Sequence, residues 1–384
     1  MPQIPWAAMT PFGFSLPGRV IFGRGEAGRA PGLIGALGNR GVLVHGADAS
    51  RAAWLVDGLR AQGAAVLAVS CGAEPSLPML RDALDRARSQ GADWVCGLGG
   101  GSALDMAKAL AALIPAPGGI MDHLEVVGRG LPLRVPPLPC VAIPTTAGTG
   151  AEATRNAVIG LPDHGRKVSI RDEGMLPRLA IVDPALTDGC PRGVTLASGL
   201  DALAQVIEPW LSCKATPLTD ALAGPAILPG LQALMRLMQA EDPEARDRMA
   251  WPACAAASRW RMAGLARSTG RGRHRRTDRR GAWRDLRRAA GPGAGHEPAA
   301  AGDMPRLARL RADLAPALAC PPDAVPVALA DWARAQGLPG LAALGLDPAR
   351  HQAVAEAALT SSSMRGNPVT PGIGDLVAAL SAAA

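Results

Sequence analysis

The sequence predicts a doubly wound α/β domain followed by an all-α domain. Short apolar runs alternate with helical segments over residues 1–185, which is typical of a mostly parallel sheet covered by helices. From about Pro191 onward, β-branched runs nearly vanish and long Ala/Leu-rich segments follow. We therefore expect an α/β domain over residues 1–187 and a helical domain over residues 188–384.

The expected elements of the first half alternate regularly. Each expected strand is a short apolar run, and each expected helix spaces its apolar residues at helical intervals. The strands are expected at 41–45, 64–70, 94–98, 140–143 and 179–182, and the helices at 51–62, 77–90 and 102–113.

The second half is expected to contain helices alone. Because the chain has no Tyr and only three Phe, its core must be aliphatic. The helical segments are 195–212, 217–240, 244–265, 304–315, 323–336 and 348–363.

Composition narrows the class of protein. Seven Cys are scattered without a C-x-x-C pair, which argues against a disulfide framework or a Cys-type zinc site and fits a reducing compartment. The first residues show no secretory signal, and no apolar run approaches the ~18 residues of a membrane span. We expect a cytoplasmic protein without a membrane partner.

The positive charge is confined to one segment. Residues 267–288 contain ten Arg and two Asp, so a segment charge of +8 within a chain charge of +7 leaves the rest at −1. Such a run suits nucleic-acid phosphates, but aromatic interleaving is limited to Trp283 and no nucleic-acid-binding motif is present. We rank a translated frame error first, a disordered loop second and nucleic-acid binding third, and expect no nucleic-acid partner.

A glycine-rich turn follows the expected strand 94–98. Gly99, Gly100, Gly101 and Ser102 lead directly into the next helix. Glycines allow close approach of a phosphate, and a helix start offers unpaired N–H groups and a partial positive charge. Ser102 is expected to cap the helix, with Asp105 completing a capping box. The alternative is an ordinary tight turn between a strand and a helix, but such a turn does not need three consecutive glycines.

A hydroxyl-rich loop follows the expected strand 140–143. Residues 144–152 contain Thr145, Thr146 and Thr149 together with two glycines. Hydroxyl groups at a strand end suit the polar groups of a ligand, and a Ser/Thr-type turn is an equal alternative.

Several longer stretches resemble the iron-containing alcohol dehydrogenase family. They are residues 97–108, 143–154, 179–184, 199–208 and 362–368, and the similarity covers residues 13–264 and 304–380. The resemblance implies a dehydroquinate-synthase-like fold, in which a nucleotide-binding α/β domain and a helical domain enclose a cleft for cofactor, metal and substrate.

The resemblance also implies a dinucleotide site, for NAD or NADP. Gly100, Gly101 and Ser102, with Gly99 before them, would bind the pyrophosphate. The nicotinamide side would be lined by Thr145, Thr146 and Thr149. Lys167 matches a family lysine near the nicotinamide ribose and otherwise indicates a solvated charge. Gly46 stands where many members carry an acidic residue, which would favour a free ribose hydroxyl over a phosphate. Because this chain lacks the acidic residue, the choice between NAD and NADP stays open.

The metal site implied by the resemblance is incomplete. The family holds Fe2+ or Zn2+ with one Asp and three His, and the metal polarises the alcohol oxygen. Asp201 matches the family Asp, whereas Gln205 stands where a His is usual, and a neutral amide is a poor ligand for either metal. The other two His belong in the anomalous Arg-rich segment 265–300, where His274 matches neither motif. We therefore expect Fe2+ or Zn2+ to be held weakly or lost.

A frame error would account for this segment. One possible coding of residues 265–270, read in another frame, gives G-A-V-H-G, and a coding of residues 281–297 likewise gives a family-like peptide that contains a His. The four His outside the segment have no partner spacing for a metal, and we expect a surface or loop position for each: His45, His123, His164 and His351.

The resemblance makes the chain an oxidoreductase that transfers a hydride between an alcohol or aldehyde and NAD(P) with a divalent metal. Asp201 is its one catalytic candidate, and a homodimer is expected. Two alternatives stay open. One is a catalytically impaired member with a frame-disrupted metal site that still binds dinucleotide, and the other is a maleylacetate-reductase-type enzyme.

Overall fold

The computed structural model describes residues 13, 15–259, 305–359, 369 and 371–383. The chain divides after Cys190 into two compact units. The first is an α/β unit over Ser15–Cys190, and the second is helical in its described parts. The expected fold class is confirmed.

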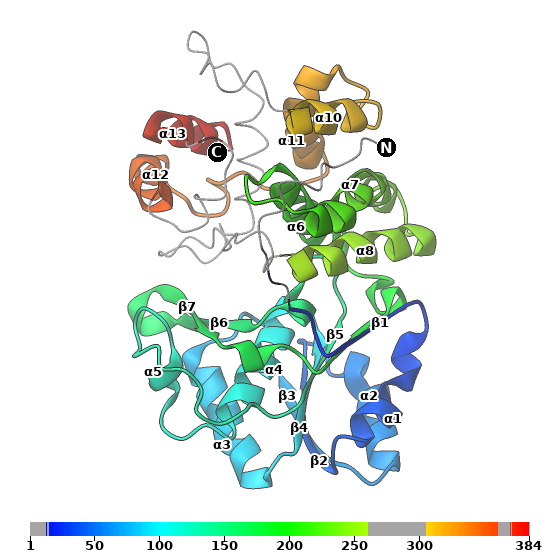
Figure 1. Ribbon diagram of the computed structural model, residues 1–384, viewed down its shortest axis with the longest axis vertical. Coiled ribbons are helices and arrows are strands. Elements are labelled where there is room, and N and C mark those ends of the chain that lie inside the picture. The colour runs from blue at the N-terminus through cyan, green and yellow to red at the C-terminus, as the bar shows by residue number, and fades with distance from the viewer. Residues whose placement is uncertain (1–12, 14, 260–304, 360–368, 370, 384) are drawn as a thin grey trace. The chain divides into compact units, whose positions relative to one another are not determined.

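A six-stranded sheet forms the centre of the α/β unit (Figure 1). Its neighbouring strands all pair in parallel, in the order β1-β8-β5-β4-β2-β3. The direction of winding reverses between β2 and β4, and ligands bind at such a switch point in open α/β sheets. The strands are β1 (Arg19–Phe22), β2 (Arg40–His45), β3 (Ala65–Ser70), β4 (Trp94–Gly99), β5 (Cys140–Pro144) and β8 (Leu179–Val182).

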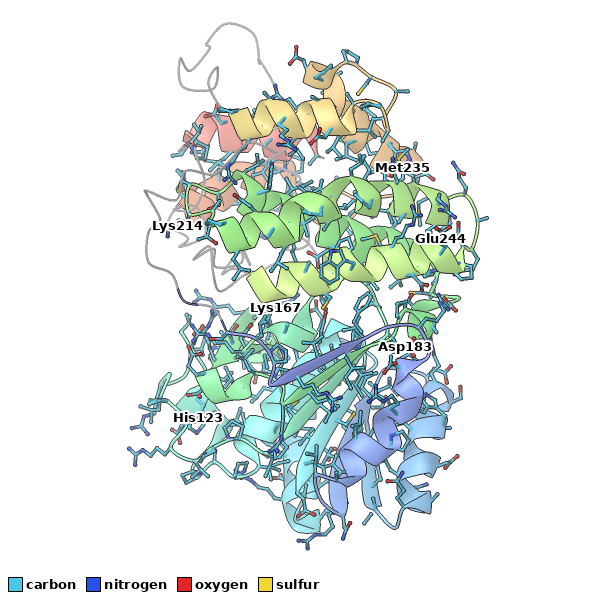
Figure 2. All side chains as sticks on the ribbon, turned by 45° about the vertical axis from the view of Figure 1, so that its right-hand side comes forward. His123, Lys167, Asp183, Lys214, Met235 and Glu244 are labelled. Carbon is cyan, nitrogen blue, oxygen red and sulfur yellow. The ribbon has the colours of Figure 1, made fainter. Side chains whose placement is uncertain are left out.

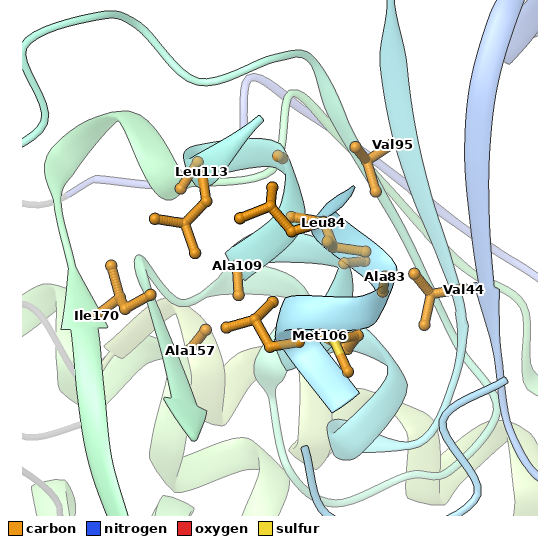
Figure 3. Close-up of a cluster of buried hydrophobic side chains, with 14 of the residues drawn as sticks. Val44, Ala83, Leu84, Val95, Met106, Ala109, Leu113, Ala157 and Ile170 are labelled. Carbon is orange, nitrogen blue, oxygen red and sulfur yellow. The ribbon is translucent and has the colours of Figure 1, made fainter. Parts of the chain in front are cut away.

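Helices cover both faces of this sheet because the buried strands are apolar on both faces. On one face, Leu43 packs with helices α1 (Ala30–Gly35) and α2 (Ser50–Ala61). On the other face, Val42 and Val44 pack with α3 and α4 (Figure 3). Helix α3 spans Leu77–Gln90, α4 spans Gly101–Leu113, and the short helix α5 spans Ile120–His123.

An antiparallel hairpin was not expected from the sequence. Its strands are β6 (Asn156–Leu161) and β7 (Arg166–Arg171). Every second residue is buried, including Ala157 of β6 and Ile170 of β7, which face α4 in Figure 3. This alternation is typical of a half-buried strand. The buried side chains of the hairpin pack against α4.

Asp183 joins the end of β8 to the beginning of the unit. Its buried carboxylate accepts hydrogen bonds from the N–H groups of Gly25 (3.0 Å), Ala27 (2.9 Å) and Ala185 (2.9 Å). Asp183 is labelled in Figure 2. The residue belongs to the family-like stretch 179–184, and in the structure its carboxylate accepts hydrogen bonds from backbone N–H groups.

The helical unit is built around three helices that pack on one another: α6 (Arg192–Leu211), α7 (Pro217–Leu237) and α8 (Pro243–Arg259). Arg306 ties a later helix to them, since its guanidinium pairs with both oxygens of Asp220 at 2.6 Å. The later helices are α10 (Pro305–Leu314), α11 (Val325–Ala335), α12 (His351–Leu359) and α13 (Ile373–Ala382).

The expected helices are present wherever the chain is described, and α1, α5 and α13 were not expected. The expected segments 244–265 and 348–363 run beyond the described residues at their C-terminal ends. Within the described part of the chain, no helix has the length and apolarity that crossing a membrane requires.

Candidate functional site

The glycine loop lies at the switch point of the sheet. It follows β4, and Gly46 follows the neighbouring strand β2. A methyl group on Gly99 would lie 3.4 Å from the backbone nitrogen of Gly46, so the two strand ends are in close contact. The loop therefore occupies the place where a doubly wound sheet binds a ligand.

Packing explains two of the three glycines. A methyl group on Gly99 would lie 2.7 Å from the Cβ of Ala103, and one on Gly101 would lie 2.8 Å from the Cγ2 of Thr149. Gly100 differs, because a methyl group there would make only ordinary contact, at 3.5 Å, with Thr146. Its φ of −73° is also open to any residue. Neither packing nor backbone geometry requires glycine at position 100, which points to the close approach of a ligand.

The start of α4 carries no side-chain cap. The N-cap residue is Gly100, which has no side chain to accept a hydrogen bond from the first turn. By contrast, the Ser76 hydroxyl of α3 accepts a hydrogen bond from the N–H of Met79 at 3.4 Å. The first N–H groups of α4 and the positive end of its dipole thus remain suited to a phosphate.

The expected capping box at α4 is wrong. The helix begins at Gly101, one residue earlier than expected, so Ser102 lies inside the first turn and is not the N-cap. Asp105 lies two residues beyond the N3 position that a capping box requires. Its carboxylate instead accepts a hydrogen bond from the N–H of Val158 in β6 at 3.1 Å.

The hydroxyl loop packs directly on the glycine loop. The N–H of Thr145 donates to the carbonyl of Gly99 at 3.0 Å, extending the pairing of β4 with β5. Thr146 lies beside Gly100 and Thr149 beside Gly101. All three threonines are half-buried. The structure therefore brings the two sequence-predicted loops into one site.

Gly46 leaves open space beside this site. A methyl group on Gly46 would meet nothing within 4 Å. The nearest carboxylate along the chain, that of Asp48, accepts hydrogen bonds from the Ser50 hydroxyl (2.6 Å) and N–H (2.9 Å). These hydrogen bonds lower the pKa of Asp48 below its ordinary value.

Lys167 lies on the hairpin strand β7 and is labelled in Figure 2. Its ammonium pairs with the Glu74 carboxylate, which follows β3, at 2.7 Å. Since its side chain is only 22% exposed, it is not the fully solvated charge that the sequence alone suggested. The pair joins the hairpin to the loop that follows β3.

The sequence analysis missed a buried cation next to the site. Lys108 of α4 is 1% exposed, and its ammonium lies 3.0 Å from the Asp105 carboxylate. It also donates to the hydroxyl of Thr154 (2.8 Å) and to the carbonyl of Asn156 (2.6 Å). The available signal was the pair of charges, three residues apart, in a helix that is otherwise almost entirely apolar.

The candidate metal donors lie on helix α6 of the other unit. Asp201 is half-buried and Gln205 is buried one turn later, as the i, i+4 spacing predicts. Across residues 15–259, 305–359 and 371–383, no three His, Cys, Asp or Glu side chains are placed to hold a metal ion. His274 and the Arg-rich segment, with the proposed frame change, fall outside the described residues.

The expected surface or loop placement of the histidines is wrong in three of four cases, because His45, His123 and His351 lie in β2, α5 and α12. His45, His123 and His351 are buried, and His164 is exposed. The Nδ1 of His45 lies 2.7 Å from the Gly46 carbonyl, and that of His123 lies 3.0 Å from the Leu131 carbonyl. Each thus has a local backbone partner, which no spacing pattern could have shown.

Two family models match the chain. The model described as iron-containing alcohol dehydrogenase matches residues 17–184. The model described as the C-terminal domain of the Fe-containing alcohol dehydrogenase family matches residues 195–269. The second match ends inside the anomalous segment 265–300.

Curated relatives align over part of their length. A probable alcohol dehydrogenase, EutG, of Escherichia coli is 36% identical over 220 residues, covering 57% of this chain and 55% of the relative. An NAD-dependent methanol dehydrogenase of Bacillus methanolicus is 39% identical over 181 residues, covering 46% of each chain. The chain thus spans about half the length of the curated relatives it matches.

Solved structures share the fold over nearly the whole chain. An iron-containing alcohol dehydrogenase from Thermococcus thioreducens has a TM-score of 0.79 at 23% identity and covers 96% of this chain and 99% of its own. An NADH-dependent butanol dehydrogenase from Thermotoga maritima has a TM-score of 0.74 at 21% identity, with coverages of 98% and 99%.

Proposed function

The chain belongs to the iron-containing alcohol dehydrogenase family, and from that premise we propose that it transfers a hydride between a small alcohol or aldehyde and NAD or NADP. The family implies a nicotinamide dinucleotide and a divalent metal. The observation that carries the proposal is the contact between the glycine loop and the hydroxyl loop at the switch point of the sheet.

The residues of the α/β unit would bind and orient the dinucleotide. Gly99, Gly100, Gly101 and Ser102 present the uncapped start of α4 to the pyrophosphate, where the N–H groups and the helix dipole stabilise negative charge. Thr145, Thr146 and Thr149 add hydroxyl groups beside it. Lys167 would contact the ribose on the nicotinamide side.

Asp201 and Gln205 would provide the metal donors of α6. A bound Fe2+ or Zn2+ would polarise the alcohol oxygen and lower its pKa. Asp201 is the catalytic candidate, because its carboxylate is a suitable ligand, whereas the Gln205 amide is a weak one. We propose that the metal is held weakly or lost and that alcohol oxidation by this chain is correspondingly slow.

Calorimetry with NAD and NADP, combined with an ethanol or butanol oxidation assay in added Fe2+ or Zn2+, tests both parts. We expect dinucleotide binding together with turnover well below the ~10 s⁻¹ that is ordinary for enzymes. Ordinary turnover would contradict the weak metal site, and absence of binding would contradict the dinucleotide site.

A Gln205→His variant sharpens this assay, because it restores a usual ligand at an unchanged position of α6. We expect higher metal affinity, measured by equilibrium dialysis with Zn2+. We also propose that the chain forms a homodimer, which light scattering of the purified chain measures directly.

A further inference from the structure

We propose that Lys108 is a positioning residue for dinucleotide binding, which holds the hydroxyl loop against the glycine loop through a buried hydrogen-bonded chain. The inference rests on the proposed function, because it concerns the same site. Lys108 would touch neither cofactor nor substrate.

The first step is the burial of the ammonium. Lys108 lies two turns into α4, and its side chain is fully buried. A buried cation is stabilised only by paired charge and hydrogen bonds. Lys108 has the Asp105 carboxylate at 3.0 Å, the Thr154 hydroxyl at 2.8 Å and the Asn156 carbonyl at 2.6 Å.

The second step leads from these partners to the site. The Thr154 hydroxyl donates to the carbonyl of Ala151 at 3.3 Å, and the Ala151 N–H donates to the hydroxyl of Thr149 at 3.4 Å. Thr149 in turn packs on Gly101 at the start of α4. A continuous set of contacts therefore runs from the buried ammonium back to the glycine loop at the start of the same helix.

The third step is the asymmetry of the anchor. Asp105 holds β6 through the Val158 N–H, whereas Lys108 holds Thr154, which precedes the hairpin, and Asn156 at the start of β6. Gly150, at φ +61°, gives the chain a sharp turn immediately after Thr149. The hydrogen bond from Thr145 to Gly99 holds the beginning of the hydroxyl loop, and the contacts of Lys108 hold the chain that follows its end at Thr149.

Two variants remove the anchor without leaving a buried charge unpaired, since Thr154→Val keeps the Lys108–Asp105 pair. Lys108→Met/Asp105→Asn removes both charges, and the new amide oxygen still accepts from the Val158 N–H. Thr154→Val is milder, because it removes only the hydroxyl that links Lys108 to Ala151.

Arg88→Met is the matched control. Arg88 also binds α4 through a cation, but at the opposite end of the helix, where it donates to the carbonyls of Leu113 (2.7 Å) and Ala116 (2.8 Å). It should lower stability without moving the hydroxyl loop.

The dissociation constants of NADH and NADPH are measured by fluorescence titration of the full chain, alongside urea unfolding midpoints. We expect both anchor variants to raise the dissociation constant of the dinucleotide that the wild type binds by about tenfold, because small misplacements of positioning groups are costly. Arg88→Met should lower the midpoint and leave the dissociation constant unchanged.

Wild-type affinity in Thr154→Val, or an equal loss of affinity in Arg88→Met, would overturn the role of Lys108. If the double variant does not fold, the comparison of Thr154→Val with Arg88→Met decides alone. A wild-type chain that binds neither dinucleotide contradicts the proposed function, and this inference with it.

Discussion

Gly46 lies where a single side chain could distinguish between NAD and NADP. It follows β2 next to the glycine loop, in open space that a larger group could occupy. An acidic side chain at this position would accept hydrogen bonds from a free ribose hydroxyl and repel a 2′-phosphate.

We therefore expect Gly46→Asp to weaken NADPH binding by at least about tenfold relative to NADH, since adjacent like charges are destabilising. Fluorescence titration of both dinucleotides measures the ratio. A ratio that does not change would mean that the ribose does not lie beside Gly46.

The cysteines differ in exposure, and the two in the α/β unit beside the site, Cys71 and Cys140, are buried. Burial, with a smaller contribution from the Asp105 carboxylate, raises the pKa of the Cys71 thiol to about 12, and burial raises that of Cys140 to about 12. The reactive thiolate of either residue therefore forms only as the pH approaches 12.

At pH 8 we expect iodoacetamide to alkylate the exposed Cys213 of the native protein and to spare Cys71 and Cys140. Peptide mass spectrometry over time follows each site. Alkylation of Cys71 at the rate of Cys213 would show that the end of β3 opens readily.

Among the secondary-structure elements, β8 depends on the carboxylate at its end. Asp183→Ala would leave three backbone N–H groups without their acceptor, those of Gly25, Ala27 and Ala185. We expect a loss of about 2–4 kcal/mol in the free energy of unfolding, measured by urea denaturation.

The control is Asp188→Ala, which removes an exposed pair with Arg24 at 2.7 Å and should cost no more than about 1 kcal/mol. Equal losses in the two variants would show that burial does not distinguish the two carboxylates.

Elements with strong patterns could be predicted from the sequence, and those fixed by tertiary contacts could not. The strand 94–98, the helix 77–90 and the glycine turn carried clear apolar runs and turn residues. The hairpin β6–β7 was missed because its alternation is short and carries charges on its outer side. The start of α4 was misplaced because the extended backbone of Gly100, and not a polar side chain, begins the helix.

The contacts that bring the residues of the candidate site together could not be predicted from the sequence. The motif contained Lys108, but its partner Thr154 lies 46 residues further along the chain. By contrast, the i, i+4 placement of Asp201 and Gln205 follows from helix geometry alone.

Over the whole molecule, the two halves of the chain support different conclusions. The first family match covers nearly the whole α/β unit, and the second stops at residue 269. The site of the α/β unit is built from contacts among described residues, whereas α6 supplies two candidate donors and one of them is an amide. The molecule therefore supports dinucleotide binding more strongly than catalysis.

The most direct test is a calorimetric titration of the full chain with NADH and NADPH, in the wild type and in Gly100→Asp. The N-cap geometry of Gly100 suits Asp, so the free energy of unfolding should be unchanged or rise by about 0.3 kcal/mol. The same carboxylate would occupy the first N–H groups of α4 and repel the pyrophosphate. Ala324→Asp, at the N-cap of α11, adds the same charge elsewhere.

We expect the wild type and Ala324→Asp to bind a dinucleotide with equal affinity. Gly100→Asp should lose at least about tenfold in affinity, with its unfolding midpoint unchanged or raised. Undiminished binding by Gly100→Asp, or no binding by the wild type, would contradict it.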